Sequence, residues 1–166
     1  MVYDSVNRRT LLYGGSDGWW IDDTWKFETP TPASVIPFGS ACAGSAGTPQ
    51  LAAAPYELPW LGDTIHHRVT NVPPTEPGAV FLTGFTPVAP ASLAPIGMVG
   101  CTLLVSIDWA TFAPNVAGAA EWTLAVPVSA SLVGASIQQQ AFPLDAAANP
   151  FGLSASNALT ATFGVR

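Results

Sequence analysis

Proline and glycine recur along most of the chain, and they restrict its fold more than any other feature does. The 166 residues include 16 prolines and 15 glycines, and few intervals between them could hold a helix of three turns. The proline-free stretch SASLVGASIQQQAF contains β-branched residues and Gly134, which disfavour a helix. We therefore expect a chain built from short strands and turns.

Strand patterns recur between the turn-forming segments. The stretch 62–72 alternates, with Ile65, His67 and Val69 on one face, and it is predicted to form a hairpin with 79–85 through the turn 73–78. Further strands are predicted at 9–15, 101–107, 121–128, 134–144 and 157–165. The segments 86–100, 108–120 and 145–156 are predicted to be turn-rich connections. This pattern predicts an all-β fold, a β-sandwich of jelly-roll or Greek-key type. The sequence does not separate a sandwich from an open barrel.

Charge is distributed unevenly, and this predicts the domain boundaries. Eight of the sixteen charged residues lie within 1–28, and the other 138 residues hold the rest. Residues 29–37, TPTPASVIP, are uncharged and rich in Pro and Thr, as linkers often are. We therefore expect a strand segment at 1–28, a linker at 29–37 and a β-domain at 38–166.

The composition also argues against several classes of partner. Net charge is −6 with only five basic residues, which does not favour nucleic-acid binding. No apolar run reaches the length of a membrane span. Residues 1–28 lack the pattern of a signal peptide, so an export signal, if one exists, would have been removed or lain upstream. Charged residues are 10% of the chain, against roughly 25% in a typical soluble domain. That deficit fits a surface buried against a neighbour, an extracellular setting, or the amino-acid bias of a high-GC genome.

The opening segment resembles a partial kelch repeat. An apolar strand ends in an acidic residue (Val2, Tyr3, Asp4), the basic Arg8 and Arg9 follow, and a second strand closes on a double glycine (Leu11, Leu12, Tyr13, Gly14, Gly15). Asp23, Thr24 and Trp25 come after a polar loop. A kelch propeller needs about four or more blades, and at most one is present here. The resemblance implies that 1–28 derives from a longer protein or packs on the β-domain; a chance hairpin is the alternative.

The body resembles a C-terminal domain of large secreted or surface proteins of environmental bacteria, of planctomycete and myxobacterial type. The resemblance covers 38–164 and is carried by FGSACAGSAGTPQL, LGDTIHHRVTNVPP, IGMVGCTLLVS and IQQQAFPLDAAANPFGLSASNALTATFG. It implies an extracellular or cell-surface location and no particular chemistry.

Cys42 and Cys101 are the two cysteines, both flanked by glycine-containing turns. In an exported β-domain such a pair indicates a disulfide; two separate buried thiols are the alternative. His66 and His67 are adjacent on a strand and point to opposite faces, so a shared metal ion is not expected. The turn DAAAN, 145–149, is a weak calcium candidate, and a solvated turn is the simpler interpretation. We expect no catalytic constellation, metal site or cofactor.

The sequence leaves two functions open. The first is a non-enzymatic extracellular structural module that associates with its own copies or with a surface or matrix protein through strand edges. A donated or shared strand would come from Val2, Tyr3, Leu11, Leu12 and Tyr13. The second is a carbohydrate-binding or adhesion module in which Tyr56, Trp60 and Trp109 contact glycan. Trp122 alternates with Leu124 and Val126 along its strand and is predicted to belong to the core.

Overall fold

A computed structural model describes residues 2–4, 9–16, 18, 20–28 and 31–165. These residues form two compact units, 1–31 and 32–165, and each is considered by itself. The described part of the chain contains thirteen strands and two short 3-10 turns but no α-helix, so the all-β prediction is confirmed. No helix that could span a membrane occurs among these residues.

The N-terminal unit is a three-stranded antiparallel sheet in the order β1-β2-β3. Its strands are β1 (Val2–Asp4), β2 (Arg9–Ser16) and β3 (Trp20–Glu28). The register shifts between Tyr13 and Gly15, where Gly14 has a φ of 74°. A glycine tolerates this left-handed conformation, so the double glycine shapes the end of β2.

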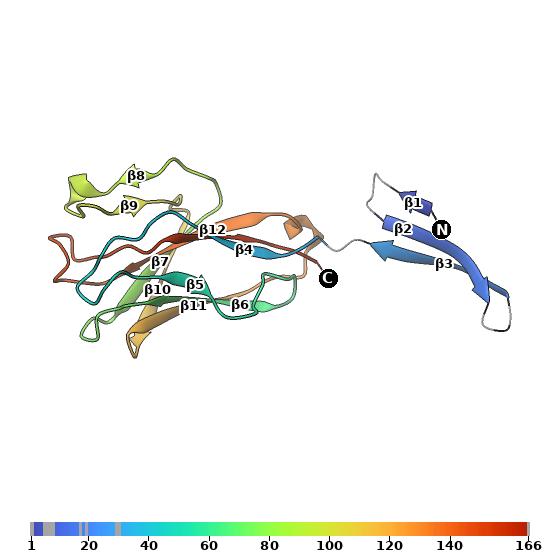
Figure 1. Cartoon of the computed structure of the whole chain (residues 1–166), viewed down its shortest axis with the longest axis horizontal. Helices are drawn as coiled ribbons and strands as arrows, with labels where there is room; N and C mark the ends of the chain where they lie inside the picture. Colours follow the sequence, from blue (N-terminus) through green and yellow to red (C-terminus); the bar gives the residue numbers. More distant parts are fainter. Residues whose placement is uncertain (1, 5–8, 17, 19, 29–30, 166) are drawn as a thin grey trace. The chain divides into compact units, whose positions relative to one another are not determined.

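The second unit is one eight-stranded antiparallel sheet that curls until it is nearly closed, like a barrel. Its strand order is β4-β13-β12-β7-β10-β11-β6-β5. Figure 1 shows these strands around a common interior, with the short β8–β9 pair beside them. The bounds are β4 (Ser34–Phe38), β5 (Leu51–Ala53), β6 (Thr64–Thr70), β7 (Gly78–Gly84), β10 (Trp109–Val116), β11 (Ala119–Ala125), β12 (Ser136–Pro143) and β13 (Ala158–Thr162). Outside the main sheet lie β8 (Ala91–Ser92), η1 (Ala94–Ile96), β9 (Thr102–Leu103) and η2 (Ala130–Leu132).

Inward-facing residues of the strands form the main core. They include Phe81, Ile65, Val69, Trp122 and Leu159, each at most 3% exposed. The alternation predicted for 62–72 is present, because Ile65, His67 and Val69 are buried in β6. Trp122 is in the core, as predicted.

The predicted hairpin between 62–72 and 79–85 is wrong. β6 pairs with β5 and β11, whereas β7 pairs with β10 and β12. The β10–β11 hairpin is inserted between β6 and β7 in the sheet. The residue types in a turn predict where a strand ends. They do not predict which strand it pairs with when the connection is longer, because packing in the rest of the fold then determines the partner.

Three other segments differ from the sequence-based description. Residues 109–116, predicted as part of a connection, form β10. The segment 29–37, predicted as a linker, contributes its later residues to β4, which begins at Ser34. Only Thr102–Leu103 of the predicted strand 101–107 is a strand. There the buried side chain of Gln140 accepts the Leu104 N–H at 2.9 Å, a bond that a neighbouring strand would otherwise supply.

Candidate functional site

The sheet opens between β10 and β11. The two strands are joined by a tight turn in which Ala117 and Gly118 have φ values of 52° and 82°. They pair only next to this turn, at Asn115 with Ala120 and Val116 with Ala119. Beyond these pairs, described residues 109–114 are registered only with β7, and 121–125 only with β6. Each strand therefore presents an edge of backbone N–H and C=O groups to the other. We call this region the β10–β11 seam.

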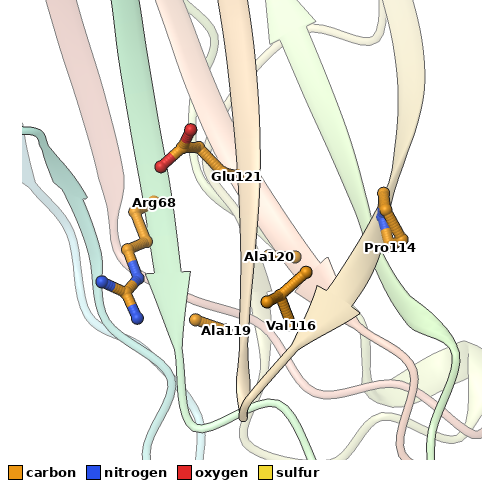
Figure 2. Close-up of a pocket in the computed structure, with 6 residues that line it drawn as sticks. All are labelled: Arg68, Pro114, Val116, Ala119, Ala120 and Glu121. Atoms are coloured by element: carbon orange, nitrogen blue, oxygen red, sulfur yellow. The ribbon is translucent and has the colours of Figure 1, made fainter.

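Pro114 lies where the two strands begin to separate. A proline lacks the backbone N–H, so it is tolerated in a sheet mainly at an edge. A hollow of about 350 Å³ lies here, lined by Arg68, Pro114, Val116, Ala119, Ala120 and Glu121. Figure 2 shows these six residues, with Pro114 on β10 and Glu121 on β11. The sequence of β10 is thus suited to a strand that is paired on one side only.

At its wide end the seam leads to a larger cavity of about 580 Å³. Four aromatic side chains contribute to its wall: Phe85, Trp109, Trp122 and Phe163. The other lining residues are Thr83, Leu124, Pro127, Leu132, Ala135, Ser136 and Ile137. None of these eleven residues is charged. Because four of them are aromatic, we refer to the space as the aromatic cavity. Phe85 and Trp109 remain 58% and 50% exposed.

A chain of buried polar side chains ends at this cavity. His67 Nδ1 lies 2.8 Å from Gln139 Oε1, and Gln139 Nε2 donates to Thr83 Oγ1 at 3.3 Å. Because a carbonyl oxygen only accepts, Nδ1 of His67 carries the proton. All three side chains are at most 2% exposed. Burial lowers the pKa of His67, and the hydrogen bond to Gln139 opposes this shift only in part, so the ring is neutral near neutral pH.

The predicted glycan contacts lie at different places. Trp109 stands at the rim of the aromatic cavity. Tyr56 is fully exposed and lines a separate groove beside β4 and β5. Trp60 is half-buried and forms an isolated bridge with Gly164. The structure therefore does not bring the three side chains into one cavity.

The residues predicted to donate a strand lie in the N-terminal sheet. Val2 and Tyr13 are 64% and 68% exposed, and Leu11 and Leu12 are half-buried. The side chain of Tyr3 lies outside the described set. β2 is paired on both sides, by β1 and β3, so of the two strands that hold these residues only β1 lies at an edge.

The predicted disulfide is confirmed. Cys42 and Cys101 are joined across 59 positions, next to a second apolar cluster that contains Met98, Phe142 and Ala155. The bond ties the long segment between β7 and β10 to the chain just after β4. Together with the all-β fold, it is the sequence-based prediction that the structure supports most directly.

Three acidic side chains, those of Glu57, Asp108 and Asp145, form hydrogen bonds within the domain. The side chain of His66 lowers the pKa of Glu57, and the Ser106 hydroxyl with the Phe85 N–H lowers the pKa of Asp108. Asp145, in the calcium candidate DAAAN, is buried and accepts the Ser45 N–H at 2.6 Å and the Ser45 hydroxyl at 2.7 Å. No group of three or more His, Cys, Asp or Glu that could hold a metal ion occurs in the described residues.

Sequence reasoning missed Thr83, Gln139 and the whole of β10. The one available signal was the glutamine run 138–140 within an apolar strand, since buried amides need specific partners. The kelch and surface-domain resemblances stay predictions. Comparison with protein-family models, with curated proteins and with solved structures finds no match to this chain.

Proposed function

We propose that this chain is a non-enzymatic extracellular structural module that associates with other copies of itself through exposed strand edges. The β10–β11 seam is the observation that carries the proposal. There two strands within one sheet pair at two positions only and leave their remaining edges open. Such edges accept an additional extended strand readily.

Three further features support association with a copy of the same chain. Charged residues are scarce in the body, so copies repel one another weakly. The N-terminal sheet exposes Val2, Tyr13 and Trp25, and β1 is an edge strand of that sheet among the described residues. The segment β1 is therefore the donor that we favour. The disulfide is consistent with an extracellular or cell-surface location.

We also assign the barrel-like sheet to the Greek-key class. Among the strands of the main sheet, β7, β10 and β11 are consecutive and lie side by side, and β6, which precedes them in the chain, lies beside β11. The kelch-like origin of 1–28 and the bacterial surface-domain resemblance of 38–164 belong to the same proposal. Binding of a surface or matrix protein in place of a second copy is the alternative partner.

Analytical ultracentrifugation of the full chain over a wide concentration range tests the association. We expect oligomers that weaken at least about tenfold when Ala110→Lys and Thr123→Lys are combined, because lysines at open edges oppose strand addition. Ala110 and Thr123 lie on the two sides of the seam and are exposed. Thr75→Lys with Ala130→Lys adds the same charge at exposed positions elsewhere. A monomer at the highest concentration, or equal weakening by both pairs, would refute the proposal.

Binding of glycan through Tyr56, Trp60 and Trp109 is a separate prediction. Trp109 favours it most, because this side chain is half-exposed at a cavity rim. Tryptophan fluorescence during titration with soluble polysaccharides checks it, and an unchanged spectrum would count against it.

A further inference from the structure

The aromatic cavity has the properties of a small-molecule site. Its volume of about 580 Å³ lies within the range of roughly 300–1,000 Å³ of ligand pockets, which often occupy the mouths of β-barrels. Phe85, Trp109, Trp122 and Phe163 offer ring faces and edges to an occupant. Such walls favour a flat or ring-shaped molecule.

The lining of the cavity also indicates that its occupant is uncharged. Because none of its eleven lining residues is charged, an ion placed there would lose its hydration without gaining a partner. Thr83 and Ser136 carry the only side-chain hydrogen-bond acceptors among the lining residues, because the indole N–H groups of Trp109 and Trp122 can only donate. A monosaccharide, with hydroxyls around its whole ring, would leave most of them unpaired. An uncharged and largely apolar molecule fits better.

The buried polar chain determines what Thr83 can offer. Gln139 Oε1 is fixed by the proton on His67 Nδ1, so the amide directs its N–H groups toward Thr83. The Thr83 oxygen therefore accepts, and its own proton remains available as a donor. No acceptor for that proton is found among the described residues. Thr83 lines the cavity, so the polar chain delivers one hydrogen-bond donor to an apolar site.

From these observations we infer that the aromatic cavity binds an uncharged ring-shaped small molecule whose carbonyl or ether oxygen accepts a hydrogen bond from Thr83. Gln139 and His67 act as positioning residues, because they orient the Thr83 hydroxyl without lining the cavity. An aromatic side chain from an associating strand is the main competing occupant. It would fill only part of a space of this size, which favours a free molecule.

Two probes of equal ring size test the inference on the full chain. Coumarin carries a lactone carbonyl, whereas naphthalene also has two fused six-membered rings but contains no oxygen and no hydrogen-bond acceptor of that kind. Titrations followed by the NMR signals of the Trp109 and Trp122 indoles should show binding of both, with coumarin tighter. In Thr83→Val the coumarin affinity should fall about tenfold, the value of one hydrogen bond of roughly 1.4 kcal/mol, and the naphthalene affinity should stay unchanged.

Two further variants keep the test decisive. Thr123→Val removes a hydroxyl from the exposed outer face of β11 and should leave both affinities as they are. Trp109→Ala, at a half-exposed position, should lower both equally, and it provides the answer if Thr83→Val does not fold. The inference is overturned if neither probe shifts the indole signals at millimolar concentration, if Thr83→Val weakens both probes equally, or if glucose binds more tightly than coumarin.

Discussion

The side-chain amide of Asn157 forms two hydrogen bonds with the backbone of Leu51. Its Oδ1 accepts the Leu51 N–H at 2.9 Å, and its Nδ2 donates to the Leu51 carbonyl at 3.0 Å. Leu51 begins β5, one end strand of the eight-stranded sheet, and Asn157 directly precedes β13, the second strand from the other end. One side-chain amide thus links the two sides of the sheet where the strands themselves do not pair.

Removing this amide should therefore destabilise the domain. Asn157→Ala leaves both polar groups of Leu51 without a partner, at a residue that is only 3% exposed. We expect the free energy of unfolding to fall by about 1–3 kcal/mol, measured by urea denaturation. Asn157→Ser, whose hydroxyl is too short to make both bonds, should lose nearly as much. A loss below about 0.5 kcal/mol, the usual effect at an ordinary surface position, would show that the bridge contributes little.

Gln138 and Gln140, two positions apart on β12, should respond differently to the same substitution. Gln140 is fully buried; its amide accepts from Leu104 and donates to the carbonyls of Thr102 and Ser156. Gln138 has a buried Oε1 without a partner in the described residues. Gln140→Leu should lower the unfolding free energy by about 3 kcal/mol or more, because three backbone groups lose their partner. Gln138→Leu should leave it unchanged or raise it. Similar losses of unfolding free energy in the two variants would contradict the conclusion that only the Gln140 amide stabilises the fold.

The disulfide gives a third prediction. Closing a loop of 59 positions stabilises by about 4 kcal/mol in the chain-entropy model. Cys42→Ala with Cys101→Ala should lower the urea midpoint accordingly. Reductant should lower the midpoint of the natural chain and leave that of the double variant unchanged. Mass spectrometry verifies that the natural chain is fully reduced. If its urea midpoint is then unchanged, this stabilisation is ruled out.

Local patterns predicted the strands better than their arrangement. Ile65, His67 and Val69 alternate with polar neighbours, so the buried face of β6 could be identified from the sequence. Partner choice could not, because β6 and β7 are separated in the sheet by a hairpin that follows them in the chain. The strand β10 was missed because Pro114 and two alanines resemble a connection. A proline is tolerated in β10 because most of this strand is paired on one side only.

The candidate site was predictable only in part for a related reason. Trp109 was predicted to contact glycan, and the structure places it at the rim of the aromatic cavity. Its neighbours in the wall, such as Thr83 and Phe163, come from distant strands. Their convergence depends on the strand order, which no local pattern specifies.

The buried ring of His67 makes stability depend on pH in a defined direction. Burial lowers its pKa below the ordinary 6.5, so the unfolded chain binds this proton more readily than the folded chain does. The neutral ring therefore makes its full contribution to the free energy of unfolding above about pH 6.5. That contribution is lost as the pH falls from there toward the lower pKa of the folded state. Glu57 and Asp108 also have lowered pKa values, but their contributions are lost only below the ordinary 4.5 and 3.8.

Urea denaturation between pH 7.5 and 5 should thus show a falling unfolding free energy in the natural chain. His67→Gln should be less stable at pH 7.5, because it disturbs the contact with Trp122 at a ring distance of 5.4 Å, yet its stability should vary less over this range. An equal slope in the natural chain and His67→Gln would show that another group causes the pH dependence, because only protonation of His67 is removed by this substitution.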